Sequence, residues 1–211
     1  MKKSISAIVL VLVSLAACSQ QADPSDIDQK VQAFLQNHGA WHNLNVPASD
    51  GKLLYQLILD NNYKQALEIG TSTGHSTIWM AWALSKTGGK LITVELDRAR
   101  HEEALKNFKE AGVDHIIDAR LADAHELVPV LKGPFDFVFS DADKGWYQNY
   151  FEAVDPKLKV GGCYATHNVS DRYGSGSNRA YLKFLLGLNN YETTVDDSGR
   201  GMSISYKKSE R

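Results

Sequence analysis

The chain has 211 residues, of which 43% are hydrophobic and 23% are charged, and its formal net charge is -2. This length suits one domain with a full core, and the composition is ordinary for a globular protein. A near-neutral charge without blocks of like charge argues against nucleic-acid binding, and two cysteines argue against a disulfide framework.

The first 17 residues have the layout of a secretory signal. Lys2 and Lys3 precede an apolar run over residues 5–17, and the run ends at small residues. A helix that crosses a membrane needs about 20 apolar residues, so this run is too short to be a comfortable span. We therefore predict that residues 1–17 are a signal peptide.

The residues around Cys18 indicate a lipid anchor. LAAC (15–18) resembles the lipobox of bacterial lipoproteins, which implies cleavage before Cys18 and acylation of that cysteine. Ser19 resembles the residue that follows the cysteine in outer-membrane lipoproteins. We expect residues 18–25 to be a lipidated tether, and we expect the protein to contact the membrane of the bacterial cell envelope through the lipid alone, facing the periplasm. An ordinary signal peptide that ends in cysteine is the alternative.

Beyond Asp26, apolar runs of strand length alternate with segments of helical periodicity, and residues 26–211 are predicted to form one domain. Helices are expected at about 26–39, from a cap at Ser49 or Asp50 through 58, at 73–85 and 97–111, in a short segment ending near 131, and at 146–158 and 178–188. Strands are expected at 65–70, 90–96, 115–122, 135–142, 161–168, 191–197 and 201–208.

This order predicts the fold class. Strands that alternate with helices form a parallel sheet covered on both faces. The last two strands are joined by SGRG (198–201), a turn short enough to make an antiparallel hairpin at one edge. We expect a doubly wound, Rossmann-like α/β fold with a seven-stranded, mostly parallel sheet and an antiparallel C-terminal hairpin.

In such folds, ligands bind beyond the carboxyl ends of the strands. LEIGTSTGHST follows the first strand, where Gly70 and Gly74 permit a sharp turn and Ser76 opens the next helix. The segment lacks the G-x-G-x-x-G fingerprint, which disfavours a nicotinamide-dependent dehydrogenase. Glu95 ends the second strand, where an acidic side chain can accept both hydroxyls of a ribose.

The fourth strand ends in FSDADKGWY. Asp141, Asp143 and Lys144 crowd this segment, and such a cluster is costly unless a cation or a substrate uses it. A solvated salt-bridge cluster is the plainer explanation.

Together these segments resemble the small cation-dependent O-methyltransferases, the family of the catechol and caffeoyl-coenzyme A O-methyltransferases. LEIGTSTGHS matches that family's S-adenosylmethionine loop, and DADKGWY its metal-and-lysine segment. PASDGKLL, GGCYATHNV and GRGMSISYK match its other segments in the same order, over about residues 40–207. The resemblance implies the methyltransferase form of the fold, and the family's dimers make a homodimer an expectation.

The resemblance also implies roles for individual residues. Lys144 would be the base that takes a proton from the hydroxyl of a small, catechol-like acceptor, and Glu95 would bind the ribose. Ala124 would line the adenine, and Asp141 and Asn168 would be ligands of a divalent metal. The residues expected around S-adenosylmethionine are Glu68, Gly70, Thr71, Ser72, Ser76, Glu95, Ala124 and Asp141.

The chain departs from the family at His167. The family's usual ligand pair there is Asp-Asn, and this chain has His167–Asn168. Imidazole in place of a carboxylate would shift preference from magnesium toward manganese, zinc or iron at a site of Asp141, His167 and Asn168. Alternatively His167 is itself the general base of a metal-free enzyme, or the site has decayed and His167 is a polar residue at a strand end.

Two functions remain open. An O-methyltransferase that uses S-adenosylmethionine and a divalent metal is favoured by Glu68, Gly70, Glu95, Asp141 and Lys144 together. A non-catalytic lipoprotein that keeps the fold to bind a ligand or partner is favoured by the envelope location, because S-adenosylmethionine is made in the cytoplasm.

Overall fold

The computed structural model describes residues 24–42, 44–170, 172 and 176–210, so the expected signal peptide and Cys18 lie outside the described residues. None of the helices in these ranges is long and apolar enough to span a membrane. The helices are α1 (Pro24–Asn37), α2 (Ala48–Asn61), α3 (His75–Thr87), α4 (Arg98–Glu110), α5 (Ala124–Val130), α6 (Tyr147–Val154) and α7 (Gly176–Leu186). The strands are β1 (Gln65–Ile69), β2 (Lys90–Glu95), β3 (Ile117–Leu121), β4 (Phe135–Ser140), β5 (Leu158–His167), β6 (Tyr191–Asp196) and β7 (Met202–Lys207).

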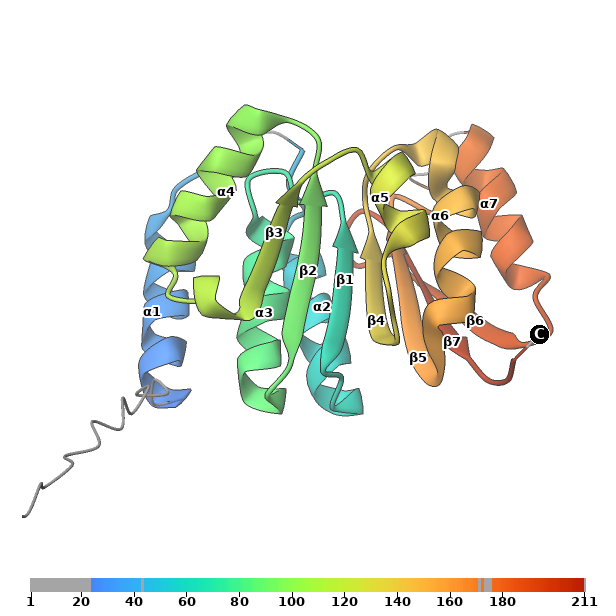
Figure 1. Cartoon of the computed structure of the whole chain (residues 1–211), viewed down its shortest axis with the longest axis horizontal. Coiled ribbons are helices and arrows are strands. Elements are labelled where there is room, and N and C mark those ends of the chain that lie inside the picture. The colour runs from blue at the N-terminus through green and yellow to red at the C-terminus, as the bar shows by residue number, and fades with distance from the viewer. Residues whose placement is uncertain (1–23, 43, 171, 173–175, 211) are drawn as a thin grey trace, which may run out of the picture.

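The sheet has seven strands in the order β3-β2-β1-β4-β5-β7-β6, which confirms the predicted fold class (Figure 1). β1 to β5 pair in parallel, whereas β7 runs antiparallel to both β5 and β6. The chain moves outward in one direction from β1 to β3 and then returns to place β4 on the other side of β1. This reversal leaves a crevice beyond the carboxyl ends of β1 and β4.

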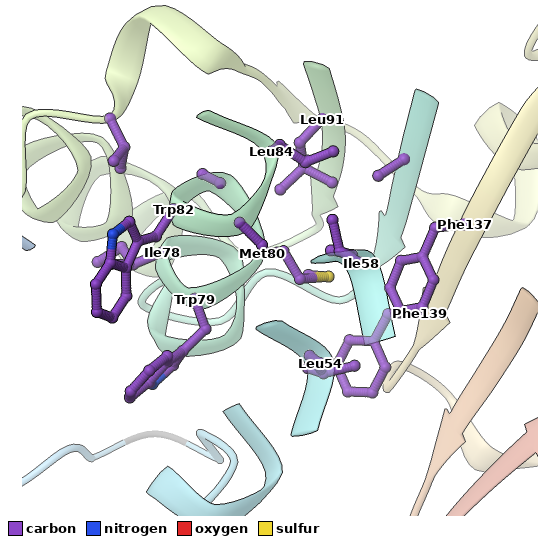
Figure 2. Packing of buried hydrophobic residues seen from close by; sticks show 14 of the residues in the cluster. Leu54, Ile58, Ile78, Trp79, Met80, Trp82, Leu84, Leu91, Phe137 and Phe139 are labelled. Atoms are coloured by element: carbon purple, nitrogen blue, oxygen red, sulfur yellow. The ribbon is translucent and has the colours of Figure 1, made fainter. Parts of the chain in front are cut away.

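Both faces of the sheet are buried. On β4, Phe137 and Phe139 pack toward α1 to α3, while Val138 points to the opposite face, toward α5 to α7. Figure 2 shows the first layer, in which side chains of α2 and α3, among them Leu54, Ile58 and Met80, lie on one side of the two phenylalanines. Each fully buried aromatic contributes about 1.5–3 kcal/mol, so the layers hold the strand ends rigidly in place.

Three local predictions differ from the structure. α6 ends at Val154 and gives way to a 3-10 turn over Asp155–Lys157, because Pro156 lacks the N–H that a longer helix requires. β5 begins at Leu158, and its register shifts against β4 between Phe135 and Phe137. The glycines at 161–162 therefore lie within the strand. α2 begins after Pro47 without a side-chain cap, so neither Ser49 nor Asp50 caps it.

Candidate active site

A cavity of about 300 Å³ opens beyond the carboxyl ends of β1, β2 and β4, at the reversal of strand order. Most of its lining residues lie at the ends of these strands, in the loops that follow them or at the start of α5, and Leu44, Arg100 and Tyr150 complete the lining. The lining residues are Leu44, Gly70, Ser72, Val94, Glu95, Leu96, Arg100, Asp123, Ala124, His125, Asp141, Ala142, Asp143 and Tyr150. Five of the eight expected cofactor residues are among them: Gly70, Ser72, Glu95, Ala124 and Asp141.

The turn after β1 brings backbone to the floor of this cavity. Gly70 has φ +102°, and a Cβ on it would lie 2.6 Å from the carbonyl oxygen of Asp141. Glycine is therefore required both for the left-handed backbone and for the close approach of the loops after β1 and β4. Ser72 also has positive φ, at +51°. The backbone of 70–72 thus turns into the cavity without large side chains in the way.

Glu68, Thr71 and Ser76, which were expected to hold the cofactor, lie beneath the cavity rather than on it. The Glu68 carboxylate is fully buried and accepts hydrogen bonds from the hydroxyls of Ser76 (2.5 Å), Thr77 (2.5 Å) and Thr93 (2.6 Å). Burial raises the pKa of Glu68 to about 7, against the opposing effect of these hydroxyls. Thr71 shares a hydrogen bond with Thr93. This network ties β1, β2 and α3 together and fixes the turn from below.

Glu95, at the end of β2, forms one wall. Its carboxylate accepts hydrogen bonds from the backbone N–H groups of Ser72 (2.8 Å) and Asp97 (2.9 Å). Arg100 Nε lies 4.0 Å away. These donors fix the direction of the carboxylate, and each oxygen keeps a second acceptor position that a ligand hydroxyl can use.

A stacked histidine forms another part of the cavity lining. Asp123 caps α5 by accepting a hydrogen bond from the N–H of His125 (2.8 Å). The His125 ring stacks on Trp146 with centroids 3.9 Å apart, and its Nε2 lies 3.3 Å from Asp143. Trp146 therefore supports His125 from behind, and His125 rather than the tryptophan lines the cavity.

Behind Asp141 a chain of polar groups leads into the protein. His167 Nδ1 lies 2.9 Å from Asp141 Oδ2, and His167 Nε2 lies 2.7 Å from Asp50 Oδ2. Lys144 Nζ donates to Asp141 Oδ1 at 3.1 Å, although Lys144 itself is not among the lining residues of the cavity. The Tyr147 hydroxyl donates to the His167 carbonyl oxygen at 3.0 Å. The expected catalytic residues Lys144 and His167 thus meet on the two oxygens of one carboxylate.

The charges of these hydrogen-bonded side chains stabilise one another. Burial of the imidazole disfavours its charged form, but the hydrogen bonds to Asp141 and Asp50 outweigh this effect and raise the pKa of His167 to about 9. Burial would likewise raise the pKa of Asp50, but the hydrogen bonds from His167 and from the N–H of Arg200 lower it. The result is a histidine held as imidazolium between two carboxylates.

The expected metal site of Asp141, His167 and Asn168 does not fit this arrangement. A metal ligand needs a free lone pair on an imidazole nitrogen, and both nitrogens of His167 already face carboxylate oxygens. Because both ring nitrogens are engaged in these contacts, His167 has no free lone pair with which to accept a proton as a general base. Among the described residues, no group of three or more His, Cys, Asp or Glu side chains could hold a metal ion. The carbonyl oxygen of Asn168 accepts a hydrogen bond from Asn178 Nδ2 at 2.9 Å.

The sequence pattern did not indicate Asp50 as part of the site. It lies 117 residues before His167 in the chain, inside the first turn of α2, where an acidic residue is ordinarily read as helix stabilisation. The hydroxyl of Tyr147, which begins α6, is likewise buried, against the end of β5.

Comparison with known proteins agrees with this architecture. A family model described as O-methyltransferase matches residues 18–173. A catechol O-methyltransferase from Niastella koreensis is 42% identical over 113 residues, which are 52% of this chain and 51% of that protein. A caffeoyl-CoA O-methyltransferase from Medicago sativa is 35% identical over 138 residues, which are 61% of this chain and 54% of that protein. The chain thus spans about half the length of these two curated relatives.

Among solved structures, the O-methyltransferase TomG from Streptomyces achromogenes was determined in complex with SAM. Its fold superposes with a TM-score of 0.71 over 92% of this chain and 93% of its own, at 26% sequence identity.

Proposed function

The chain belongs to the O-methyltransferase family, and from that premise we propose that it transfers the methyl group of S-adenosylmethionine to a hydroxyl of a small phenolic or catechol-type acceptor. The proposal rests on the cavity at the reversal of strand order, which is lined by Glu95 and Asp141, and on Lys144, which is hydrogen-bonded to Asp141. The names of the relatives, a catechol and a caffeoyl-CoA O-methyltransferase, support the acceptor class.

The cavity offers each part of the cofactor a matching surface. Glu95 would accept hydrogen bonds from both ribose hydroxyls, because its carboxylate is already oriented by backbone donors. Ala124 and the stacked His125 would contact the adenine ring. The glycine turn at Gly70 and the start of the loop at Asp141 would leave room for the methionine end.

Methyl transfer is an in-line displacement at a carbon bound to positively charged sulfur. The acceptor hydroxyl gives its proton to Lys144 Nζ in the neutral amine form, its oxygen bonds to the methyl carbon, and the carbon–sulfur electron pair returns to sulfur. Asp141 orients Lys144 through the 3.1 Å hydrogen bond. Holding the oxygen in line supplies about 7–11 kcal/mol of the barrier reduction in favourable cases. Metal assistance, expected from the resemblance, finds no support in the donor set, and the transfer described above needs no metal ion.

Calorimetry of the full chain with S-adenosylmethionine, followed by mass-spectrometric detection of methylated catechol, tests the proposal. Lys144→Met should keep cofactor affinity and lose activity by about 10²–10⁴-fold, because it removes the proton acceptor and little of the cavity wall. Binding without transfer to catechol or caffeoyl-CoA would favour the alternative, a ligand-binding lipoprotein. An absence of cofactor binding would overturn the enzyme proposal.

We also propose that Cys18 is acylated and anchors the protein in the cell envelope. The support is the charged start, the apolar run and the small residues that precede Cys18. Mass spectrometry of the mature N-terminus should detect an acylated cysteine. The Cys18→Ala variant should leave the membrane fraction, and retention of that variant in the membrane would contradict the proposal.

A further inference from the structure

The Asp50–His167–Asp141 arrangement defines a hydrogen-bonded unit that the proposed reaction does not yet explain. The three side chains are 2%, 3% and 10% exposed, so water does not screen them. An ionised carboxylate only accepts hydrogen bonds, and His167 meets one on each nitrogen, at 2.7 and 2.9 Å. Both nitrogens must therefore carry hydrogen, which makes the ring a cation.

Part of the negative charge is balanced inside this unit. Asp50 and Asp141 supply two negative charges, and the imidazolium between them supplies one positive charge. A divalent cation bound at Asp141 would add two further positive charges next to the imidazolium, which already contacts that carboxylate. Such repulsion is large in a buried site. The position is thus already filled by a cation that belongs to the protein.

Asp50 is itself fixed by the other end of the chain. The N–H of Arg200 donates to Asp50 Oδ2 at 3.1 Å, and the turn between β6 and β7 closes over the carboxylate. Gly199 is packed so closely against Asp50 that a Cβ there would overlap the carboxylate oxygens. Asp50 therefore cannot swing away, and it holds His167 in one orientation.

Resting on the proposed methyltransferase activity, we infer that His167 stands in for the divalent cation, so that methyl transfer by this protein is metal-independent. Asp50 and His167 act as positioning residues. His167 fixes Asp141 through Oδ2, and Asp141 in turn holds Lys144 through Oδ1. The positive charge that a bound metal ion would place beside Asp141 is supplied instead by the His167 side chain, which a chelator cannot remove.

The first experiment measures methyl transfer to catechol by the full chain in excess EDTA and with added Mg²⁺ or Mn²⁺. The wild-type rate should be the same in each condition. His167→Asp removes the imidazolium and adds a carboxylate beside Asp141, so its rate should fall about 10–100-fold in EDTA and recover when Mg²⁺ or Mn²⁺ is added. Loss of the wild-type rate in EDTA with recovery on adding metal would overturn the inference.

The second experiment does not depend on activity. Nitrogen-15 NMR of labelled histidine should show both ring nitrogens of His167 protonated at neutral pH. In Asp50→Asn this signature should weaken, and kcat should fall with cofactor affinity unchanged. Asp118→Asn, which alters a carboxylate paired with Arg120 on the surface, is the matched control and should change neither. A neutral His167 ring in the wild type would refute the inference.

Calorimetry with S-adenosylmethionine in the same buffers separates the two proposals. If the wild type neither binds the cofactor nor transfers methyl groups, the proposed function fails, while the NMR result still decides whether His167 is a buried cation. If the wild type binds the cofactor and needs metal for transfer, the enzyme proposal stands and the inference fails.

Discussion

Replacing Glu68 by glutamine should change how the stability of the protein depends on pH. The folded-state pKa of Glu68 is raised from 4.5 to about 7, with burial as the largest cause. A group with a raised folded pKa contributes stability that is fully present below its unfolded pKa and is lost as the pH rises through the folded pKa. In the wild type, this contribution should therefore fall by about 2–3 kcal/mol between pH 5 and pH 8.

The Glu68→Gln side chain has nearly the same shape and does not titrate, so it lacks this fall. Urea denaturation of both proteins at several pH values gives the free energy of unfolding. The difference, variant minus wild type, should rise by about 2–3 kcal/mol from pH 5 to pH 8 and stay level above that. A difference that stays constant across this window would refute the reasoning that burial governs this carboxyl group.

Three further predictions concern the cavity and its support. Gly70→Ala should lower the free energy of unfolding by about 3 kcal/mol, because its Cβ meets the Asp141 carbonyl. The control Gly88→Ala has φ +73° but open space around it, so it should cost only about 1–2 kcal/mol; thermal melts measure both. Glu95→Gln should weaken S-adenosylmethionine binding by about 10–100-fold in calorimetry, since hydrogen bonds to a charged group contribute about 1.5–3 kcal/mol; unchanged affinity would remove Glu95 from the ribose site. Tyr147→Phe should destabilise the protein by about 1–3 kcal/mol to urea, because a buried carbonyl loses its donor, and should leave cofactor affinity unchanged.

The fold could be predicted from the sequence because its signals are local. Apolar runs such as FDFVFS supply both faces of a buried parallel strand, and β4 does bury residues on both faces. The glycine turn after β1 and the acid at the end of β2 were likewise visible, and both line the cavity. Their positions follow from which residue ends a strand, and strand ends can be read from a single sequence.

The partners of His167 could not be predicted in this way. Asp50 reaches the imidazole only after α2 packs beside the sheet, and no spacing rule connects residues 117 positions apart. The resemblance therefore indicated a metal where the folded chain places an ion pair. Glu68 shows the same limit, because only the surrounding hydroxyls reveal that the carboxylate faces inward.

The hydrogen bond from Arg200 to Asp50 spans 150 residues, which gives it a consequence for biosynthesis. Ribosomes make Asp50 long before Arg200, so during elongation the carboxylate has no covering turn. The β5–β7 pairing runs from His167–Met202 to Cys163–Tyr206, so it can be complete only after Tyr206 has been synthesised. Because contacts between distant residues form slowly, the Asp50–His167–Asp141 arrangement should be among the last parts of the molecule to assemble. The proposed active site would then be complete only after the hairpin of β6 and β7 has been synthesised.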